Sequence, residues 1–128
     1  MHSLTIEWLE KAEGDFATAG REVRARKNPN YDSAYFHAQQ VAEKYLKAIL
    51  QENLQHIPRT HNLLNLLALC LPFEPTLMAF QDALARLDRY AVRFRYPGES
   101  ADRNEARMVY KLAKQFREFA RNLPTLNS

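Results

Sequence analysis

The stretch from Tyr31 to Gln51 constrains the fold more than any other part of the sequence. Apolar residues recur along it at steps of three and four, which is the spacing of one face of an α-helix. Two adjacent rows follow this spacing: Ala34, Ala38, Val41, Tyr45 and Ala48 in one, and Tyr35, Ala42, Leu46 and Ile49 in the other. Because two rows make a wide apolar sector, we predict a central helix that is packed by neighbours on more than one side.

The remaining face of this helix carries an ordered line of polar residues, namely His37, Gln40, Lys44 and Lys47. Two cations, an amide and an imidazole in one line could hold an anion. The alternative is an ordinary solvated face, on which Glu43 and Lys47 form an i,i+4 pair worth only ~0.3–0.5 kcal/mol. The sequence leaves both interpretations open.

The length and composition of the chain favour one compact helical domain over residues 1–128. Only three residues are glycine, which argues against glycine-rich phosphate loops and a turn-rich β fold. The single cysteine, Cys70, lies in an apolar run and suits a reducing cytoplasm. No apolar run approaches the ~18–20 residues of a membrane span, and the first residues include acids that a signal peptide would lack. We therefore expect a cytoplasmic protein with no membrane partner.

Four further helices follow from the three-and-four spacing and from the positions of proline and glycine. We expect a long first helix over about residues 6–27, a short apolar helix before Pro72, a fourth helix that ends near Pro97, and a long last helix. The residues placed to cap the later helices are Asp32 or Ser33 for the central helix, Thr60 or His61 for the short one, Thr76 for the fourth and Ser100 for the last. The predicted fold is all-α, an antiparallel up-and-down bundle of four long helices plus one short apolar connecting helix.

Two more cationic segments accompany the polar line of the central helix. One contains Arg59 and His61 before the short apolar helix, and the other contains Arg93, Arg95 and Tyr96 at the end of the fourth helix. Each also has a structural interpretation, because such residues can cap a helix or complement its dipole. A joint anion site requires the fold to bring the segments together.

Basic residues also gather at the end of the first helix and along the last one. Arg21, Arg24, Arg26 and Lys27 end the first helix, where they complement the helix dipole better than they indicate a nucleic-acid patch. The outer face of the last helix carries a basic stripe that Glu105 and Glu118 partly offset: Arg103, Arg107, Lys111, Lys114 and Arg121.

The usual catalytic and cofactor motifs are missing from the sequence. There is no Walker loop, GxGxxG, HExxH or CxxC, and the four histidines do not form a metal-ligand spacing with carboxylates on one helix. We therefore expect no metal and no bound cofactor.

Several of these segments together resemble the signature of HEPN domains (higher eukaryotes and prokaryotes nucleotide-binding). The similar segments are residues 34–48, Pro58 to Leu63 with Leu66, Tyr90 followed by Arg95-Tyr96-Pro97, and Ala12, Asp15, Phe16 and Ala19. The resemblance spans nearly the whole chain in the right order. It implies a helical bundle that commonly dimerises, and members linked to nucleotide binding, to small nucleotidyltransferase partners or to RNA cleavage.

The ribonuclease branch of that family carries an Arg-x(4–6)-His motif, which this sequence lacks. No arginine lies five to seven residues before His37, His56 or His61, and His2 is too near the start. The segment from Arg103 has the arginine but places Tyr110 where the histidine would be needed. The arrangement that activates an RNA 2′-hydroxyl in that branch is therefore absent.

We expect a non-catalytic module that binds a nucleotide or another polyphosphate and acts with a separate nucleotidyltransferase-type partner, as in toxin–antitoxin pairs. The expected ligand contacts are charges from Lys44, Lys47, Arg59, Arg93 and Arg95, hydrogen bonds from His37, Gln40 and His61, and stacking on Tyr96. One alternative is a divergent HEPN ribonuclease toxin that uses His37 or His61 as general base. The other is a homodimeric interaction subunit that has no small-molecule ligand.

Overall fold

The computed structural model describes residues 1–93 and 97–127, without the side chains of residues 90–93. It confirms the predicted all-α bundle, and the described residues contain no strand. The elements in chain order are α1 (Ser3–Arg24), α2 (Tyr31–Glu52), α3 (Leu63–Cys70), the 3₁₀ helix η1 (Pro75–Phe80), α4 (Gln81–Arg93), α5 (Arg103–Ala120) and the 3₁₀ helix η2 (Pro124–Leu126).

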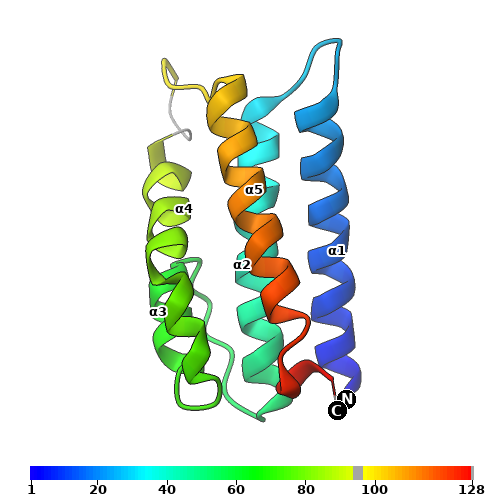
Figure 1. The fold of residues 1–128 in the computed structure, drawn as a ribbon, viewed down its shortest axis with the longest axis vertical. Helices are drawn as coiled ribbons and strands as arrows, with labels where there is room; N and C mark the ends of the chain where they lie inside the picture. Colours follow the sequence, from blue (N-terminus) through cyan, green and yellow to red (C-terminus); the bar gives the residue numbers. More distant parts are fainter. Residues whose placement is uncertain (94–96, 128) are drawn as a thin grey trace.

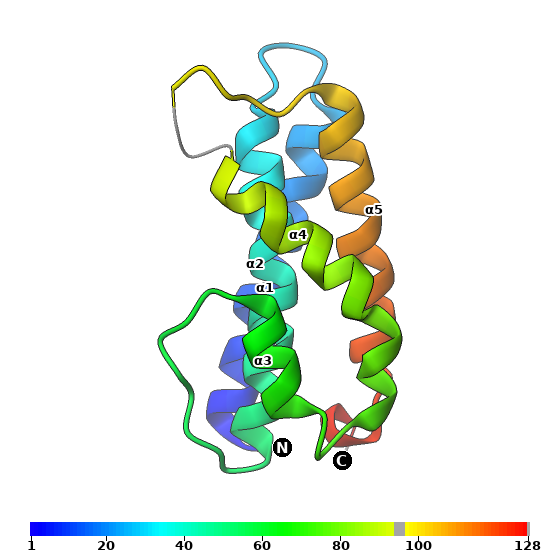
Figure 2. The same cartoon turned by 90° about the vertical axis from the view of Figure 1, so that its left-hand side faces the viewer.

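The four long helices run alternately up and down, with both ends of the chain at the same end of the bundle (Figure 1). Helix α2 packs against α1, α3, α4 and α5, so it is the central helix that its two apolar rows predict. Its inward side chains Tyr35, Leu46 and Ile49 are fully buried together with Phe116 of α5. Figure 2 shows α4 crossing the bundle obliquely, with the short α3 beside the lower half of α2.

The first helix is displaced by three residues from the range that the sequence predicts. It ends at Arg24 because Ala25 is already extended, at φ −62° and ψ 131°. Pro29 disfavours the helical conformation for the residue before it, and Asn28 takes a positive φ of 48°. Asparagine tolerates this region better than most residues, so the three residues before Pro29 form the turn rather than a last helical turn.

The predicted N-caps are wrong by one to three residues. The side chains of Asn30, Asn62 and Asp102 cap α2, α3 and α5 instead. Asp102 also forms a reciprocal capping box with Glu105. The fourth helix begins as the 3₁₀ turn η1 with Pro75 in its first turn, and no side chain caps it.

Candidate functional site

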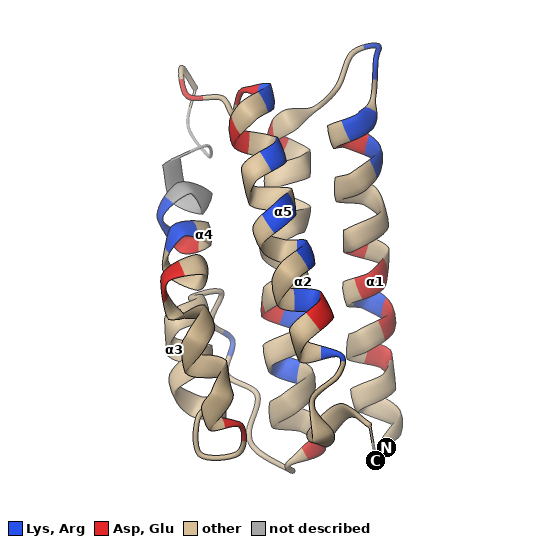
Figure 3. Cartoon of the chain, in the orientation of Figure 1, with Lys and Arg blue, Asp and Glu red and all other residues tan. Residues whose placement is uncertain are grey.

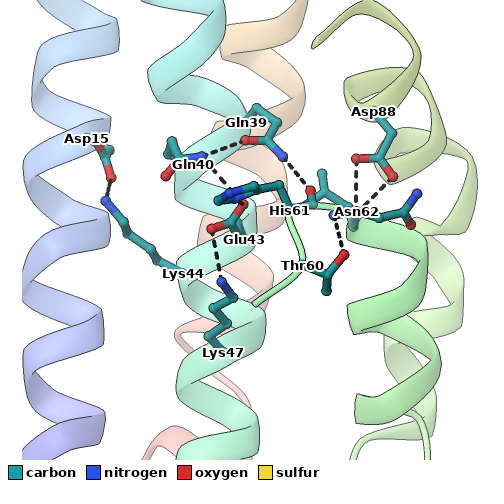
Figure 4. Close-up of polar contacts among 11 residues, drawn as sticks. Asp15, Gln39, Gln40, Glu43, Lys44, Lys47, Thr60, His61, Asn62 and Asp88 are labelled. Atoms are coloured by element: carbon teal, nitrogen blue, oxygen red, sulfur yellow. Dashed lines mark hydrogen bonds and ion pairs between the residues drawn. The ribbon is translucent and has the colours of Figure 1, made fainter. Parts of the chain in front are cut away.

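The polar line predicted on α2 forms one continuous face together with the segment that precedes α3 (Figure 4). His37, Gln40, Lys44 and Lys47 lie on α2, and His61 reaches the same face from the connecting segment. Arg59 is exposed two residues before His61. The predicted contributions of the Arg93 side chain, Arg95 and Tyr96 lie outside the described residues.

The upper part of this face centres on Asp15, a buried carboxylate of α1. Its Oδ1 lies 2.7 Å from Nδ1 of His37, and its Oδ2 accepts a hydrogen bond from Nζ of Lys44. Asp15 follows Ala12 by three residues and precedes Ala19 by four, so it occupies a core-facing position of α1. A carboxylate at such a position needs a cation from the neighbouring helix, and Lys44 supplies it.

The lower part of the face centres on Glu43, which is 3% exposed. Its Oε2 accepts a hydrogen bond from Nζ of Lys47 at 3.2 Å, and its Oε1 lies 2.9 Å from Nδ1 of His61. Because an ionised carboxylate only accepts, Nδ1 of His61 carries the hydrogen and Nε2 is left for another partner. The His61 side chain is 67% exposed, so Nε2 is available at the surface.

These contacts correct the interpretation of the α2 face as an ordinary solvated surface. The predicted Glu43–Lys47 pair forms, but Lys47 is only 6% exposed and its ammonium also lies 5.6 Å from the ring centre of Trp8. Lys44 is likewise mostly buried against Asp15. Each lysine is thus matched by a buried carboxylate, so among the described residues of this face Arg59 offers a ligand its positive charge and the two imidazoles offer hydrogen-bonding groups.

Two glutamines hold the segment that carries His61 against α2. Nε2 of Gln39 donates to the backbone oxygen of His61 at 3.0 Å. Gln40 in turn donates to Oε1 of Gln39 at 2.9 Å and to Oε1 of Glu43 at 3.4 Å. This amide chain fixes the position of the His61 backbone, while Glu43 fixes its imidazole. Gln40, which the sequence predicts as a ligand contact, thus also helps to hold His61 in position.

Asp88 of α4 anchors the other side of the same segment. Its carboxylate accepts the backbone N–H groups of Leu63 and Leu64 at 2.9–3.2 Å, at the start of α3. Burial raises the pKa of Asp88, the two N–H groups oppose that rise, and the charge of Glu43 adds to it. The segment from Arg59 to His61 is therefore held between α2 and α4.

Sequence reasoning missed Phe36 on this face. This residue is 55% exposed, and its ring meets the His37 ring edge-on, with ring centres 5.2 Å apart. Phe36 lies four residues before Gln40 and seven before Glu43, so it continues the polar line toward the start of α2. An aromatic residue in a polar helical line was the signal that could have revealed it.

A separate ionic cluster joins α1, α2 and α5. Arg117 donates to the Glu13 carboxylate at 2.8 and 2.5 Å, and the Tyr45 hydroxyl donates to it at 2.8 Å. The hydrogen bond from Arg117 holds the pKa of Glu13 below its ordinary value. Burial, together with this bond to Glu13, raises the pKa of Tyr45. The cluster links the three helices, and its residues are not part of the α2 face.

No helix in the described ranges is long and apolar enough to cross a membrane. Among those same residues, no group of three or more histidine, cysteine, aspartate or glutamate side chains is arranged to hold a metal ion.

Comparison with known proteins places this geometry in a family. The model of the HEPN domain matches residues 5–123. The crystal structure of TT1696 from Thermus thermophilus superposes with a TM-score of 0.77 at 29% sequence identity, covering 93% of this chain and 97% of that chain. No protein of curated function matches the chain. Because the family model spans nearly all of the bundle, including α1, α2 and the segment that carries His61, the chain belongs to the HEPN domain family.

Proposed function

We propose that this HEPN domain binds a nucleotide or another polyphosphate at the α2 face. The observation that carries the proposal is the pair formed by buried Glu43 and exposed His61, whose Nδ1 lies 2.9 Å from the carboxylate. In its imidazolium form this fixed ring donates from Nε2 to a phosphate oxygen while Nδ1 still donates to Glu43. The exposed guanidinium of Arg59, two residues earlier, supplies the matching charge.

The same face offers a platform for the base of a nucleotide. Phe36 lies seven residues before Glu43, about 10.5 Å along the helix at 1.5 Å per residue. An extended mononucleotide covers such a span, with its base on the Phe36 ring and its phosphate near His61. In this arrangement His37 and Gln40 border the ligand, while Lys44 and Lys47 neutralise Asp15 and Glu43 beneath it. Arg93, Arg95 and Tyr96 remain proposed ligand residues.

Thermal unfolding against a panel of nucleotides and polyphosphates tests this proposal. A ligand at a hundred times its Kd stabilises the folded state by ~2.7 kcal/mol, which corresponds to a Tm increase of roughly 10 °C for a domain of this size. We expect His61→Gln, Arg59→Gln and Phe36→Ala to reduce the increase. Matched controls are Arg86→Gln and Phe73→Ala, which alter residues on or beside other helices. An increase that survives all three site variants would refute the site, and no increase with any ligand would refute nucleotide binding.

We further propose that the domain forms a homodimer and acts with a separate nucleotidyltransferase-type protein, as in a toxin–antitoxin pair. Membership of the HEPN family, whose members include dimers and partners of nucleotidyltransferases, and the absence of an Arg-x(4–6)-His motif from the sequence support this proposal. Light scattering of the purified chain tests the dimer. Co-expression with any nucleotidyltransferase that is encoded beside this gene tests the partnership, and the absence of such a gene or of a joint complex would refute it. A stable complex whose formation is insensitive to nucleotides would favour the pure interaction subunit.

A divergent ribonuclease is a second candidate, because Glu43 orients His61 as a carboxylate orients a general base. In that reaction Nε2 of His61 would take the proton of an RNA 2′-hydroxyl. The 2′-oxygen would attack phosphorus, and the 5′-oxygen would leave with a proton from water. We expect cleavage of single-stranded RNA in the presence of a metal chelator, lost in His61→Ala with unchanged Tm. RNA that stays intact would eliminate this candidate.

A further inference from the structure

A hollow of about 590 Å³ lies between α1 and the residues that follow α5, at the end of the bundle where both chain termini lie (Figure 1). Ile6 and Leu9 of α1 and Leu126 of η2 give it apolar walls. Glu10 and Arg121 line it as well, and both are exposed. We name it the terminal hollow. None of its lining residues belongs to the polar line of α2.

The charges of the terminal hollow follow a closed ion pair by one helical turn. Arg117 of α5 donates to the Glu13 carboxylate of α1 at 2.8 and 2.5 Å. Glu10 lies three residues before Glu13, and Arg121 lies four residues after Arg117. Because α1 and α5 run in opposite directions, Glu10 and Arg121 occupy the next turn of the same interface (Figure 1). Figure 3 shows acidic residues along the lower half of α1 and basic residues along α5 next to it.

Unlike the pair above them, Glu10 and Arg121 are not joined. In the part of the chain that the structure describes, neither side chain has a hydrogen-bond or ion-pair partner. Arg121 nevertheless lies near this interface, because its charge adds to the hydrogen bond from Arg117 in holding the pKa of Glu13 below its ordinary value. The terminal hollow thus presents one carboxylate and one guanidinium that are both available to a ligand.

The balance of these charges favours a ligand with one positive and one negative group. Glu13 and Arg117 neutralise each other, so the available charges are those of Glu10 and Arg121, which are of opposite sign. A ligand with a single charge would match only one of them. The helix dipole explains a cation at the end of α5, but it explains neither the facing acid nor the hollow between them.

The other lining groups of the terminal hollow fit the same kind of ligand. Asn122 and Asn127 donate through their side-chain nitrogens to backbone oxygens, so their amide oxygens can accept from a ligand ammonium. Ile6 is 42% exposed beside these polar groups. An aliphatic group that covers Ile6 would remove apolar surface of both partners from water.

We propose that the terminal hollow binds a zwitterion with an aliphatic side chain, either a free amino acid or a short peptide. Arg121 forms charge-assisted hydrogen bonds with the ligand carboxylate, and Glu10 accepts them from its ammonium. The aliphatic side chain packs on Ile6 and Leu9. This binding is independent of the proposed nucleotide site, because the two sites share no lining residue.

Heteronuclear NMR of the isotope-labelled chain tests the proposal by titration with L-leucine and with leucyl-leucine, each to about 10 mM. We expect the amide signals of Glu10 and Asn122 to shift, and the ligand with the lower Kd identifies the source as a free amino acid or a peptide. Leucinamide lacks the carboxylate and 4-methylpentanoate lacks the ammonium. Each should bind about tenfold more weakly than leucine, the loss typical of one charge-assisted contact. Glycine keeps both charges but has no aliphatic group, so it should also bind more weakly.

Glu10→Gln and Arg121→Gln should each raise the Kd about tenfold. The matched controls are Glu7→Gln on α1 and Arg107→Gln on α5, which make the same changes at exposed positions outside the hollow. His61→Gln should leave the titration unchanged, which separates the hollow from the α2 face.

Three results would overturn the proposal. Equal effects of Glu10→Gln and Glu7→Gln would show that the ligand does not occupy the terminal hollow. Leucinamide or 4-methylpentanoate binding as tightly as leucine would show that the site does not select a zwitterion. Signals that stay in place with both leucine and leucyl-leucine would show that no such ligand binds. Thermal unfolding checks that each variant folds, and the comparison of ligands on the unaltered chain does not depend on any variant.

Discussion

The lower part of the α2 face makes a quantitative prediction about Lys47. Replacing it with methionine keeps most of the side-chain volume but removes the ammonium that lies 3.2 Å from the Glu43 carboxylate. Their side chains are only 8% and 4% exposed, so water cannot replace the lost partner. The variant also loses the cation–π contact with Trp8. We therefore expect a buried carboxylate whose remaining hydrogen-bond partners among the described residues are His61 and Gln40.

Breaking a buried ion pair by removing one partner costs ~3–5 kcal/mol of unfolding free energy. We expect about 3 kcal/mol, the lower end of that range, because His61 still donates a hydrogen bond to Glu43. For 128 residues the entropy of unfolding is about 0.27 kcal/mol/K, so this loss lowers Tm by roughly 11 °C. An exposed i,i+4 pair would contribute only ~0.3–0.5 kcal/mol, or about 1–2 °C.

Urea unfolding and thermal unfolding of Lys47→Met measure this loss, and the chain supplies its own control. Glu7 and Lys11 form a pair with the same i,i+4 spacing, but their side chains are 58% and 59% exposed and the charged atoms are 3.9 Å apart. Lys11→Met should therefore change Tm by less than about 2 °C. The double variant Glu43→Gln/Lys47→Met should recover much of the loss, since no unpaired charge remains. If Lys47→Met and Lys11→Met have equal effects, the buried pair stabilises the domain no more than an exposed pair does.

Three further predictions concern other buried groups. Arg117→Met removes the group that holds the pKa of Glu13 below its ordinary value of 4.5. A group with a depressed pKa contributes stability that is lost as pH falls through its pKa in the folded state. The difference in unfolding free energy between wild type and variant, measured with urea, should therefore shrink below pH 4.5. A difference that widens there would contradict this role of Arg117. Asp88→Ala removes the acceptor for the first amides of α3 and should cost ~1–2 kcal/mol in the same assay, whereas a neutral result would show that Asn62 caps the helix alone. Burial raises the pKa of Cys70 to about 12, so thiol reagents should modify it in urea but hardly in the folded protein, and rapid modification of the folded protein would refute its burial.

The fold could be predicted because the periodicity of apolar residues marks the helices of this chain. The two apolar rows of α2 have the positions that are buried in the structure, and the prolines mark the breaks between helices. The caps could not be predicted as well, because several capping residues lie side by side before each helix. Asp32 illustrates the problem: it is a suitable N-cap by type, but its carboxylate accepts the N–H of Ala101, which is 69 residues away.

Only part of the candidate site could be predicted from the sequence, for a similar reason. The line of His37, Lys44 and Lys47 follows from helical spacing alone. Whether Lys44 is free depends on an acid that another element supplies, and Asp15 reaches both Lys44 and His37 from α1. An acid on an otherwise apolar stripe is the signal that such a partner exists. The pairing itself, and the exposure of Phe36 on the same face, require the packing of the bundle.

The two contacts of Asp15 also bear on how α1 and α2 are aligned. Alanines such as Ala12, Ala19 and Ala38 occupy the core near these helices, and such small side chains tolerate sliding of one helix along another. Asp15 is tethered to His37 and to Lys44, which lie two helical turns apart on α2. A slide of one turn, about 5.4 Å in either direction, would stretch one of these two tethers and leave a charge unpaired. The ionic contacts of Asp15 thus fix how far α1 is shifted along α2. The apolar surface between the two helices would by itself permit several alignments.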